Sequence, residues 1–398
     1  MTALRPTTIA LALSVFALAS VAARADDAAP GGVLVSLRAG ARYGSAIKRA
    51  GAEGPGVRLR GTRVRLVPVA GDPQAAVARL AHARGVRWAE PNWILRDQAG
   101  GAPDDPLFSQ QGDLAELGFP AAWETAGLGS WPSRGGAPVG IVDSGIDAAH
   151  EDLRGRVAAC ATATGGRVAA GRCGDDNGHG THVAGTIGAA TDNGAGIAGI
   201  AFTSPLIVCK ALGGPQGAGT TADVAACIGW AHAAGARVIS MSLGGPASQT
   251  LATAVTAAWA RGGRAGSLLV AAAGNDGDGQ LEYPAALPDV ISVAATDDAG
   301  NPAPFSNANA DVELAAPGVD VLSARAGGGY VTMSGTSMAT PHVSAVAALL
   351  AAAQPLSTAK ALRARLDASA RDLLAPGRDP ATGYGLVDLA AALGSARR

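Results

Sequence analysis

From residue 138 onward, short and almost continuously apolar segments alternate with longer segments of helical spacing, and this alternation limits the fold more than any other feature. Expected strands lie at 138–142, 206–212, 237–241, 268–273 and 290–295, and expected helices at 222–234, 250–259 and 338–352. Strands with so few polar residues are typical of a parallel sheet whose two faces are both covered. We therefore predict an α/β domain with a parallel sheet and helices on both faces.

The chain changes in charge near residue 100. Residues 26–100 hold 12 Lys and Arg against 6 Asp and Glu, a net charge of +6, whereas residues 101–398 hold 17 against 26, a net charge of −9. A turn-rich stretch at 97–103 separates the two parts. The opposite charges favour docking of the first part on the second, although a basic surface without a partner is the alternative.

The basic part has the pattern of a small α+β domain. Strands are predicted at 33–37 and 63–69, where apolar residues alternate, and at 87–94. Helical spacing predicts a helix at 73–83. We therefore expect a small α+β domain over 26–100 and one large domain over 101–398. About 75 residues form only a marginal core on their own.

The first 25 residues have the pattern of a signal peptide. Arg5 precedes a short apolar run at 9–19, and Ala23-Arg24-Ala25 is a small-x-small cleavage site. The run is shorter than the ~20 apolar residues that a membrane span needs. We expect cleavage after Ala25, a secreted protein and no membrane span. A pI near 6.6 shows no overall basic footprint for nucleic acid.

Secretion changes how the four cysteines are interpreted. In an oxidising compartment an even number of cysteines favours disulfides, and four allow three pairings. The pairing of sequence neighbours is Cys160–Cys173 and Cys209–Cys227. A zinc site is disfavoured because no CxxC pair exists, and a buried free thiol at Cys209 is the other alternative.

Three polar residues stand at the ends of predicted elements. Asp143 ends an apolar strand in GIVDSGID, His179 lies in NGHGTHVAG ahead of a helix-like run, and Ser337 lies immediately before a long predicted helix. A serine nucleophile needs a base for its proton, and the base needs a carboxylate that fixes its tautomer. These groups meet where strands end and helices begin in α/β sheets.

Other readings of these segments have less support. A lone Asp at a strand end or a Ser before a helix is more often a cap, and a lone His in a glycine-rich loop is more often surface. Residues 217–222 fit GxGxxA, but the acidic residue that a dinucleotide site requires is missing. A zinc peptidase lacks its HExxH motif.

DSGID, HGTHVAG, AAGND and GTSMATPHV, in this order, resemble the signature blocks of the subtilisin-like serine proteases, and the resemblance covers most of 103–390. It implies that Asp143 orients His179, that His179 is the general base and acid, and that Ser337 is the nucleophile. Asn275 then donates to the oxyanion together with the Ser337 amide. His182 resembles the family's structural histidine.

The resemblance also implies how a polypeptide substrate binds. Two extended segments of small residues would pair with its backbone, namely Ser242, Leu243 and Gly244 on one side and Gly217, Ala218 and Gly219 on the other. Asp276 and Glu282 match positions near the primary specificity pocket, where two carboxylates favour Arg or Lys. A solvated loop that never faces substrate is the alternative.

Two further expectations come from the resemblance. It implies structural calcium with Asp105, Asp152 and Asn193 as candidate ligands, and no organic cofactor. It also implies that 26–100 is a pro-segment, with Ala89-Glu90-Pro91-Asn92 near its end, which inhibits the enzyme and is removed by self-cleavage between Trp93 and Pro106. We expect a monomeric secreted serine endopeptidase made as a zymogen. A catalytically silent binding protein on the same fold is the alternative.

Overall fold

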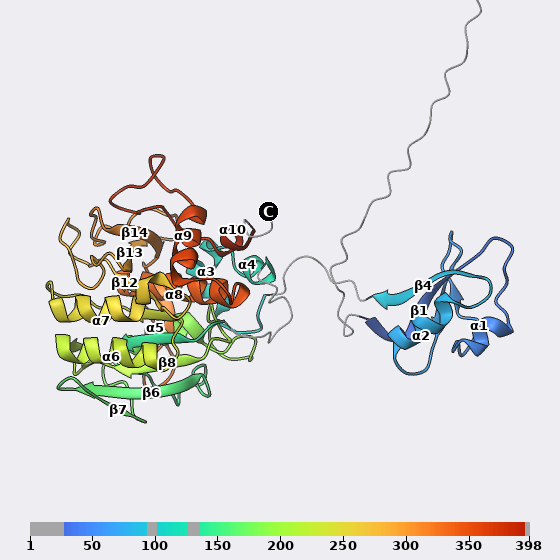
Figure 1. Cartoon of the computed structure of the whole chain (residues 1–398), viewed down its shortest axis with the longest axis horizontal. Coiled ribbons are helices and arrows are strands. Elements are labelled where there is room, and N and C mark those ends of the chain that lie inside the picture. Colours follow the sequence, from blue (N-terminus) through green and yellow to red (C-terminus); the bar gives the residue numbers. More distant parts are fainter. Residues whose placement is uncertain (1–27, 94–101, 126–135, 395–398) are drawn as a thin grey trace, which may run out of the picture. The chain divides into compact units, whose positions relative to one another are not determined.

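The computed structural model describes residues 28–93, 102–125 and 136–394, and the chain divides into two compact units, residues 1–98 and 99–398 (Figure 1). The predicted signal peptide at 1–25 lies outside the described residues.

The first unit is a four-stranded antiparallel sheet with two helices. Its sheet has the order β2-β3-β1-β4. The elements are β1 (Ala28–Leu37), α1 (Ser45–Arg49), β2 (Val57–Arg58), β3 (Val64–Pro68), α2 (Pro73–Ala81) and β4 (Val86–Trp93). The Asp72 side chain caps α2, and Leu80 of that helix packs in a core with Val33, Val35 and Val67 of the sheet. The expected strand and helix positions agree with this α+β unit.

The second unit contains an eight-stranded sheet of order β14-β13-β12-β11-β5-β8-β6-β7. Neighbouring strands are parallel except β6 and β7, which form an antiparallel hairpin. The strands are β5 (Val139–Asp143), β6 (Val157–Thr164), β7 (Arg167–Ala170), β8 (Leu206–Lys210), β11 (Val238–Met241), β12 (Leu268–Ala272), β13 (Val290–Thr296) and β14 (Val312–Pro317). All residues of β5, β12 and β13 are buried, as their apolar sequences require.

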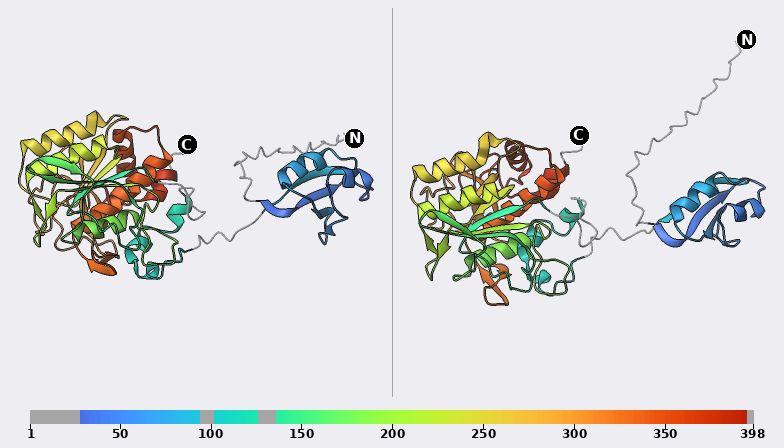
Figure 2. Two further views of the ribbon diagram at one scale, coloured as in Figure 1. Left: turned by 90° about the horizontal axis from the view of Figure 1, so that it is seen from below. Right: turned by 60° about the horizontal axis from the view of Figure 1, so that its bottom comes forward.

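Helices cover both faces of this sheet (Figures 1 and 2), which confirms the predicted fold class. Helices α5 and α8 pack together, and α6 and α7 pack together. The helices are η2 (Phe108–Gln110), α3 (Gly112–Glu116), α4 (Ala121–Thr125), α5 (His179–Gly188), α6 (Thr221–Ala233), α7 (Gln249–Trp259), η3 (Ala260–Gly262), α8 (Thr336–Ala353), α9 (Ala359–Ser369) and α10 (Leu389–Gly394). Two short hairpins complete the unit, formed by β9 (Leu212–Gly213) with β10 (Ala218–Gly219) and by β15 (Val321–Ala324) with β16 (Tyr330–Met333).

Among the described residues, α8 alone is long and apolar enough to cross a membrane, but 83% of it is buried within the protein. It contacts β11, β12, β13 and β14, so it is a core helix.

The strand order places a topological switch at β5. From β5 the chain builds β6 and β8 on one side, then crosses to build β11 through β14 on the other. In an open α/β sheet, the crevice at the carboxyl ends of the strands next to such a switch is the usual ligand site. Asp143 is the last residue of β5, and α5 begins at His179.

Two details differ from the sequence-based expectations. The β6–β7 hairpin was not expected, because its polar and small residues lack a clear apolar alternation. Helix α8 begins at Thr336, so Ser337 lies within its first turn and not immediately before it. Helix ends depend on local hydrogen bonds that periodicity does not report.

The structure contains the disulfides Cys160–Cys173 and Cys209–Cys227, and it has no free cysteine among the described residues. The first links β6 to the loop that leads to α5, and the second links β8 to α6.

Candidate active site

Asp143 and His179 are joined at the edge of the sheet where β5 ends. The Asp143 carboxylate is fully buried, and its Oδ1 accepts hydrogen bonds from His179 Nδ1 at 2.8 Å and from the Ser144 amide at 2.6 Å. Burial opposes protonation of His179, but the charge of Asp143, the hydrogen bond to it and the charge of Asp175 together raise the pKa of His179 above its usual value.

Ser337 is the second residue of the long helix α8, and its position is fixed by an irregularity in that helix. In a regular helix, each N–H donates to the carbonyl four residues earlier, so residue 341 would donate to the Ser337 carbonyl. Pro341 has no N–H and cannot make this hydrogen bond. The Ser242 hydroxyl donates to this carbonyl instead, at 2.7 Å, and the Ser337 hydroxyl donates to the Ser242 carbonyl at 3.3 Å. Within the described chain, no hydrogen bond joins Ser337 to His179. Catalytic hydrogen bonds are often long before substrate binds.

Asn275 follows β12 and is held by one end of its amide. Its Oδ1 accepts hydrogen bonds from the Thr336 amide at 2.8 Å and from the Thr336 hydroxyl at 2.9 Å. The side chain is exposed, and its Nδ2 has no protein acceptor among the described residues. The oxygen is thus anchored to the first turn of α8, while the N–H₂ group is available to an incoming ligand.

A cleft of about 520 Å³ contains His179 and both of the predicted substrate-binding segments. Ser242, Leu243 and Gly244 form one part of its lining, and Gly217, Ala218 and Gly219 form another. Ala218 and Gly219 belong to β10, which pairs with β9 beside the cleft. Because Ser337 is hydrogen-bonded to Ser242, the helix N-terminus adjoins the cleft that holds His179.

Glu282 lies against one of these segments. A Cβ atom placed on Gly244 would lie 2.7 Å from Glu282 Oε2, so the carboxylate touches the backbone there. Glu282 is half-buried, and burial together with the charges of Asp276 and Asp278 raises its pKa. Asp276 itself is exposed, and its backbone amide donates to Asn307.

Asp105, Asp152 and Asn193 belong to one hydrogen-bonded cluster at the 191–197 loop. Asp105 accepts the amides of Asp192 and Asn193 at 2.9 and 3.2 Å, and the Asn193 side chain donates to Asp152 Oδ1 at 3.0 Å. Burial above all, and also the charges of Asp152 and Asp104, raise the pKa of Asp105 to about 6. In the described part of the chain, no three His, Cys, Asp or Glu side chains are arranged to hold a metal.

His182 is fully buried one turn after His179. Its Nε2 donates to the Val321 and Val331 carbonyls at 3.1 and 3.2 Å, and burial lowers its pKa to about 4. It therefore packs as a neutral side chain, away from proton transfer.

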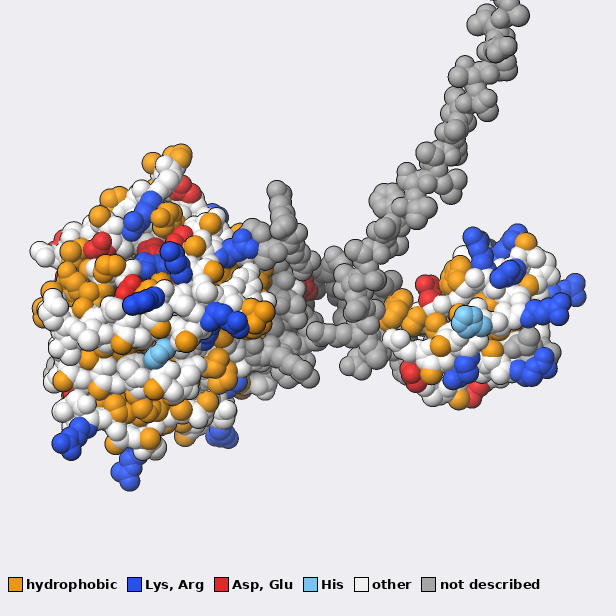
Figure 3. All heavy atoms as spheres, in the orientation of Figure 1, with side chains coloured by type: hydrophobic (Ala, Val, Ile, Leu, Met, Phe, Trp, Pro, Cys, Tyr) orange, Lys and Arg blue, Asp and Glu red, His pale blue; other side chains and the backbone are white. Residues whose placement is uncertain are grey.

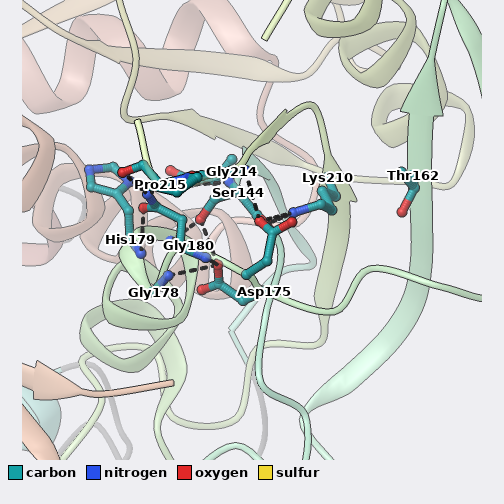
Figure 4. A network of polar contacts seen from close by, with 12 residues as sticks. Ser144, Thr162, Asp175, Gly178, His179, Gly180, Lys210, Gly214 and Pro215 are labelled. Atoms are coloured by element: carbon teal, nitrogen blue, oxygen red, sulfur yellow. Dashed lines mark hydrogen bonds and ion pairs between the residues drawn. The ribbon is translucent and has the colours of Figure 1, made fainter. Parts of the chain in front are cut away.

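The residues that hold β5 and α5 together were not predicted from the sequence. A Cβ atom on Gly180 would lie 2.2 Å from the Gly145 carbonyl oxygen, so glycine is required for this contact. The Ser144 hydroxyl accepts the Gly180 amide at 2.8 Å and donates to Asp175 at 2.9 Å (Figure 4). The available signal was the run Asp175-Asp176-Asn177-Gly178, whose side chains favour a turn just before a helix.

We expect Gly180→Ala to lower the free energy of unfolding by about 1–3 kcal/mol, because the added methyl group forces β5 and α5 apart. The control is Gly229→Ala within α6, where a Cβ atom meets nothing within 4 Å. That change should stabilise the helix by about 0.5–1 kcal/mol. Denaturant unfolding measures both, and equal effects of the two changes would contradict the close contact.

Comparisons with known proteins agree with this geometry. Residues 134–385, more than half of the chain, match the Subtilase family. The chain is 44% identical over 242 residues to a thermostable alkaline protease of Halalkalibacterium halodurans, covering 61% of this chain and just under two thirds (64%) of that protein. It is 42% identical over 261 residues to Subtilisin DY of Bacillus licheniformis, covering 64% and 89%. A solved protease structure from Pseudoalteromonas arctica is 32% identical with a TM-score of 0.63, covering 74% of this chain and 100% of that one. The chain belongs to the subtilase family of serine endopeptidases.

Proposed function

We propose that this protein is a secreted endopeptidase that cleaves polypeptides through Asp143, His179 and Ser337 and is made as a zymogen. The observation that carries the proposal is the 2.8 Å hydrogen bond between buried Asp143 and His179 in a cleft that the nucleophile helix adjoins. A half-buried serine beside the cleft, an imidazole with a fixed tautomer and a free amide donor are the groups that acyl transfer needs.

In the proposed mechanism, Ser337 Oγ attacks the scissile carbonyl carbon while His179 Nε2 takes the hydroxyl proton. Asp143 holds Nδ1–H and stabilises the imidazolium that forms. The C–N bond breaks as His179 gives the proton to the leaving amine, and an acyl-enzyme remains. Water then attacks the ester carbonyl while the same imidazole takes its proton. The bond to Ser337 Oγ breaks, the second product leaves, and His179 returns the proton to Oγ.

The negative charge on the carbonyl oxygen develops next to the start of α8. The Ser337 amide is one of the first N–H groups of this helix, which have no partner within the helix. Asn275 Nδ2 is the second donor, because its Oδ1 is occupied by Thr336. Both donors are in place before the reaction, so stabilising the oxyanion requires little reorganisation.

We expect Ser337→Ala to lower kcat by about 10⁶, the order of loss seen when subtilisin loses its nucleophile. Asn275→Ala should lower kcat by about 10²–10³ with a much smaller change in KM, because the donor acts mainly on the transition state. Peptide hydrolysis by purified, folded variants measures both. Near-wild-type turnover of Ser337→Ala would contradict the mechanism and favour a binding protein on this fold.

Glu282 supports a preference for Arg or Lys before the scissile bond. Its carboxylate touches the backbone of Gly244, one of the proposed substrate-binding residues, and Asp276 adds a second negative charge nearby. A cationic substrate side chain would lower the cost of keeping Glu282 ionised.

We expect Glu282→Gln to lower kcat/KM for peptides with Arg or Lys at this position on the order of tenfold, with little change for Leu or Phe. Asp311→Asn removes a charge at an exposed position outside the cleft and serves as the control. Kinetics on matched peptides measures the ratio. Equal cleavage after Arg and Leu by the wild type would remove the proposed preference.

Asp105, Asp152 and Asn193 are suited to hold structural calcium, together with carbonyls of the 191–197 loop. Carboxylate and amide oxygens are the ligands that Ca²⁺ prefers. Asp105 and Asp152 are both buried, and burial together with the charge of Asp152 raises the pKa of Asp105, which is consistent with a carboxylate that lacks a counterion. A bound cation would supply that compensation and fix the loop against the residues around 105.

We expect EDTA to lower the unfolding temperature on the order of 5 °C relative to calcium at a hundredfold excess over its Kd. Asp152→Asn should abolish most of this difference, whereas Asp311→Asn, at an exposed position, should keep it. Calorimetry of the inhibited enzyme measures the shift. An unfolding temperature that does not respond to EDTA would contradict a calcium site.

The first unit is suited to act as the pro-segment. It is rich in Lys and Arg (Figure 3), and the second part of the chain has a net negative charge. Ala89-Glu90-Pro91-Asn92 lies in β4, its last strand. The proposed self-cleavage site, between Trp93 and Pro106, comes next in the sequence after this strand. Residues 94–101 lie outside the described part of the chain.

A further inference from the structure

We propose that Asp175 is a positioning residue of this site. Its carboxylate ties the N-terminal end of α5 to the end of β5 and offsets the positive end of that helix, so that His179 can carry a proton during turnover. The inference rests on the proposed role of His179 as general base. Asp175 does not touch His179 or the substrate-binding segments. It acts through Ser144 and the first turn of α5, which hold His179 in place.

The Asp175 carboxylate accepts five hydrogen bonds. Figure 4 shows it beside Ser144 and Gly178. Its Oδ1 accepts the Asn177 amide at 3.0 Å, the Gly178 amide at 2.8 Å and the Ser144 hydroxyl at 2.9 Å. Its Oδ2 accepts the Thr181 amide at 2.9 Å and the Thr181 hydroxyl at 2.5 Å. Although burial alone would raise it, these hydrogen bonds hold the pKa of Asp175 below its usual value, so the carboxylate is ionised at neutral pH.

Ser144 connects this carboxylate to the catalytic pair. Its hydroxyl donates to Asp175 and accepts the Gly180 amide at 2.8 Å. Its own amide donates at 2.6 Å to Asp143 Oδ1, the atom that accepts His179 Nδ1. Two consecutive residues at the end of β5 therefore hold the first two residues of α5, and Asp175 fixes the rotamer of the connecting hydroxyl.

The second effect is electrostatic. His179 is the first residue of α5, where the unpaired amides carry a partial positive charge equivalent to about half an elementary charge. That charge disfavours an imidazolium, which must form when His179 accepts the Ser337 proton. Asp175, with a full negative charge, accepts the amide of the N-cap residue Gly178 and the amide of Thr181 in the first turn. It is also the second carboxylate, after Asp143, whose charge raises the pKa of His179.

The other charged and titratable groups around His179 do not take the place of Asp175 in this role. Asp143 makes the direct hydrogen bond, and His182 on α5 is neutral with a pKa of about 4, lowered chiefly by burial. Asp176 is exposed and is paired with Lys210, whose Nζ lies 2.7 Å from Asp176 Oδ1 and 2.7 Å from the Ser144 carbonyl oxygen. Asp176 therefore carries the same charge as Asp175, but that charge is already paired with Lys210.

The loop that carries Asp175 is itself anchored. The Cys160–Cys173 disulfide ends two residues before Asp175, and the Cys173 carbonyl accepts the Ile146 amide at 2.8 Å. Asp175 is thus held from the sheet on one side and from α5 on the other.

The experiment compares the pH dependence of kcat/KM for the wild type, Asp175→Asn and Asp176→Asn, normalised to active sites titrated with a fluorophosphonate. Losing the Asp175 charge should lower the pKa of His179, so the acid limb should move to lower pH by about half a unit or more. The plateau kcat should fall about tenfold with KM nearly unchanged, because His179 is held less well. Asp176→Asn should change neither.

An acid limb that stays in place in Asp175→Asn, or that moves as far in Asp176→Asn, would overturn the inference. If Asp175→Asn does not fold, Ser144→Ala decides the matter: it keeps the charge, so kcat should fall with the acid limb unmoved, and an unchanged kcat would overturn the inference. Failure of the proposed function has a different signature, namely a wild type without an ionisation near neutral pH or an active Ser337→Ala protein.

Discussion

The hydrogen bond between Asp143 and His179 requires that β5 end and α5 begin at the same edge of the sheet. The strand order supplies this, because β5 stands where the chain switches from one half of the sheet to the other. The contact leaves no room for a side chain at Gly180, where a Cβ atom would lie 2.2 Å from the Gly145 carbonyl oxygen. The loop before α5 leaves none at Gly145, where a Cβ atom would lie 2.5 Å from the Cys173 carbonyl oxygen. Helix and strand therefore meet backbone to backbone, and the carboxylate and imidazole are held by rigid elements on both sides.

Ser337, the proposed nucleophile, is positioned at the same edge in a different way. A proline in the second turn of α8 leaves the Ser337 carbonyl without its helical donor, and Ser242 fills that position with a hydroxyl. One of the proposed substrate-binding residues thus also fixes the serine that would attack the substrate. Asn275 is fixed by Thr336, one residue earlier. The proposed substrate-binding residue, nucleophile and oxyanion donor are therefore connected through the first turn of one helix.

The sequence allowed the parallel sheet and most of its helices to be predicted, because buried strands such as β5 and β12 are continuously apolar and the helices between them have clear boundaries. It also pointed to Asp143, His179, Asn275 and Ser337, which stand at the ends of these elements. The β6–β7 hairpin was missed because it lies at the edge of the sheet and contains small and polar residues. Asp175 was missed because an Asp in a turn-forming run looks like an ordinary cap. Three of its four partner residues, Asn177, Gly178 and Thr181, follow it closely in the sequence, as they would for such a cap. Only the link through Ser144 is made on folding, and no local pattern reports it.

The proposed chemistry depends most on Ser337 being the activated nucleophile of an intact site. Incubation of the mature protein with a fluorophosphonate, followed by peptide mass spectrometry, tests this in one measurement. We expect one adduct per molecule, on Ser337, with labelling that slows as His179 becomes protonated. A chain that is folded and yet takes no label, or that carries the label on another serine, would contradict the account.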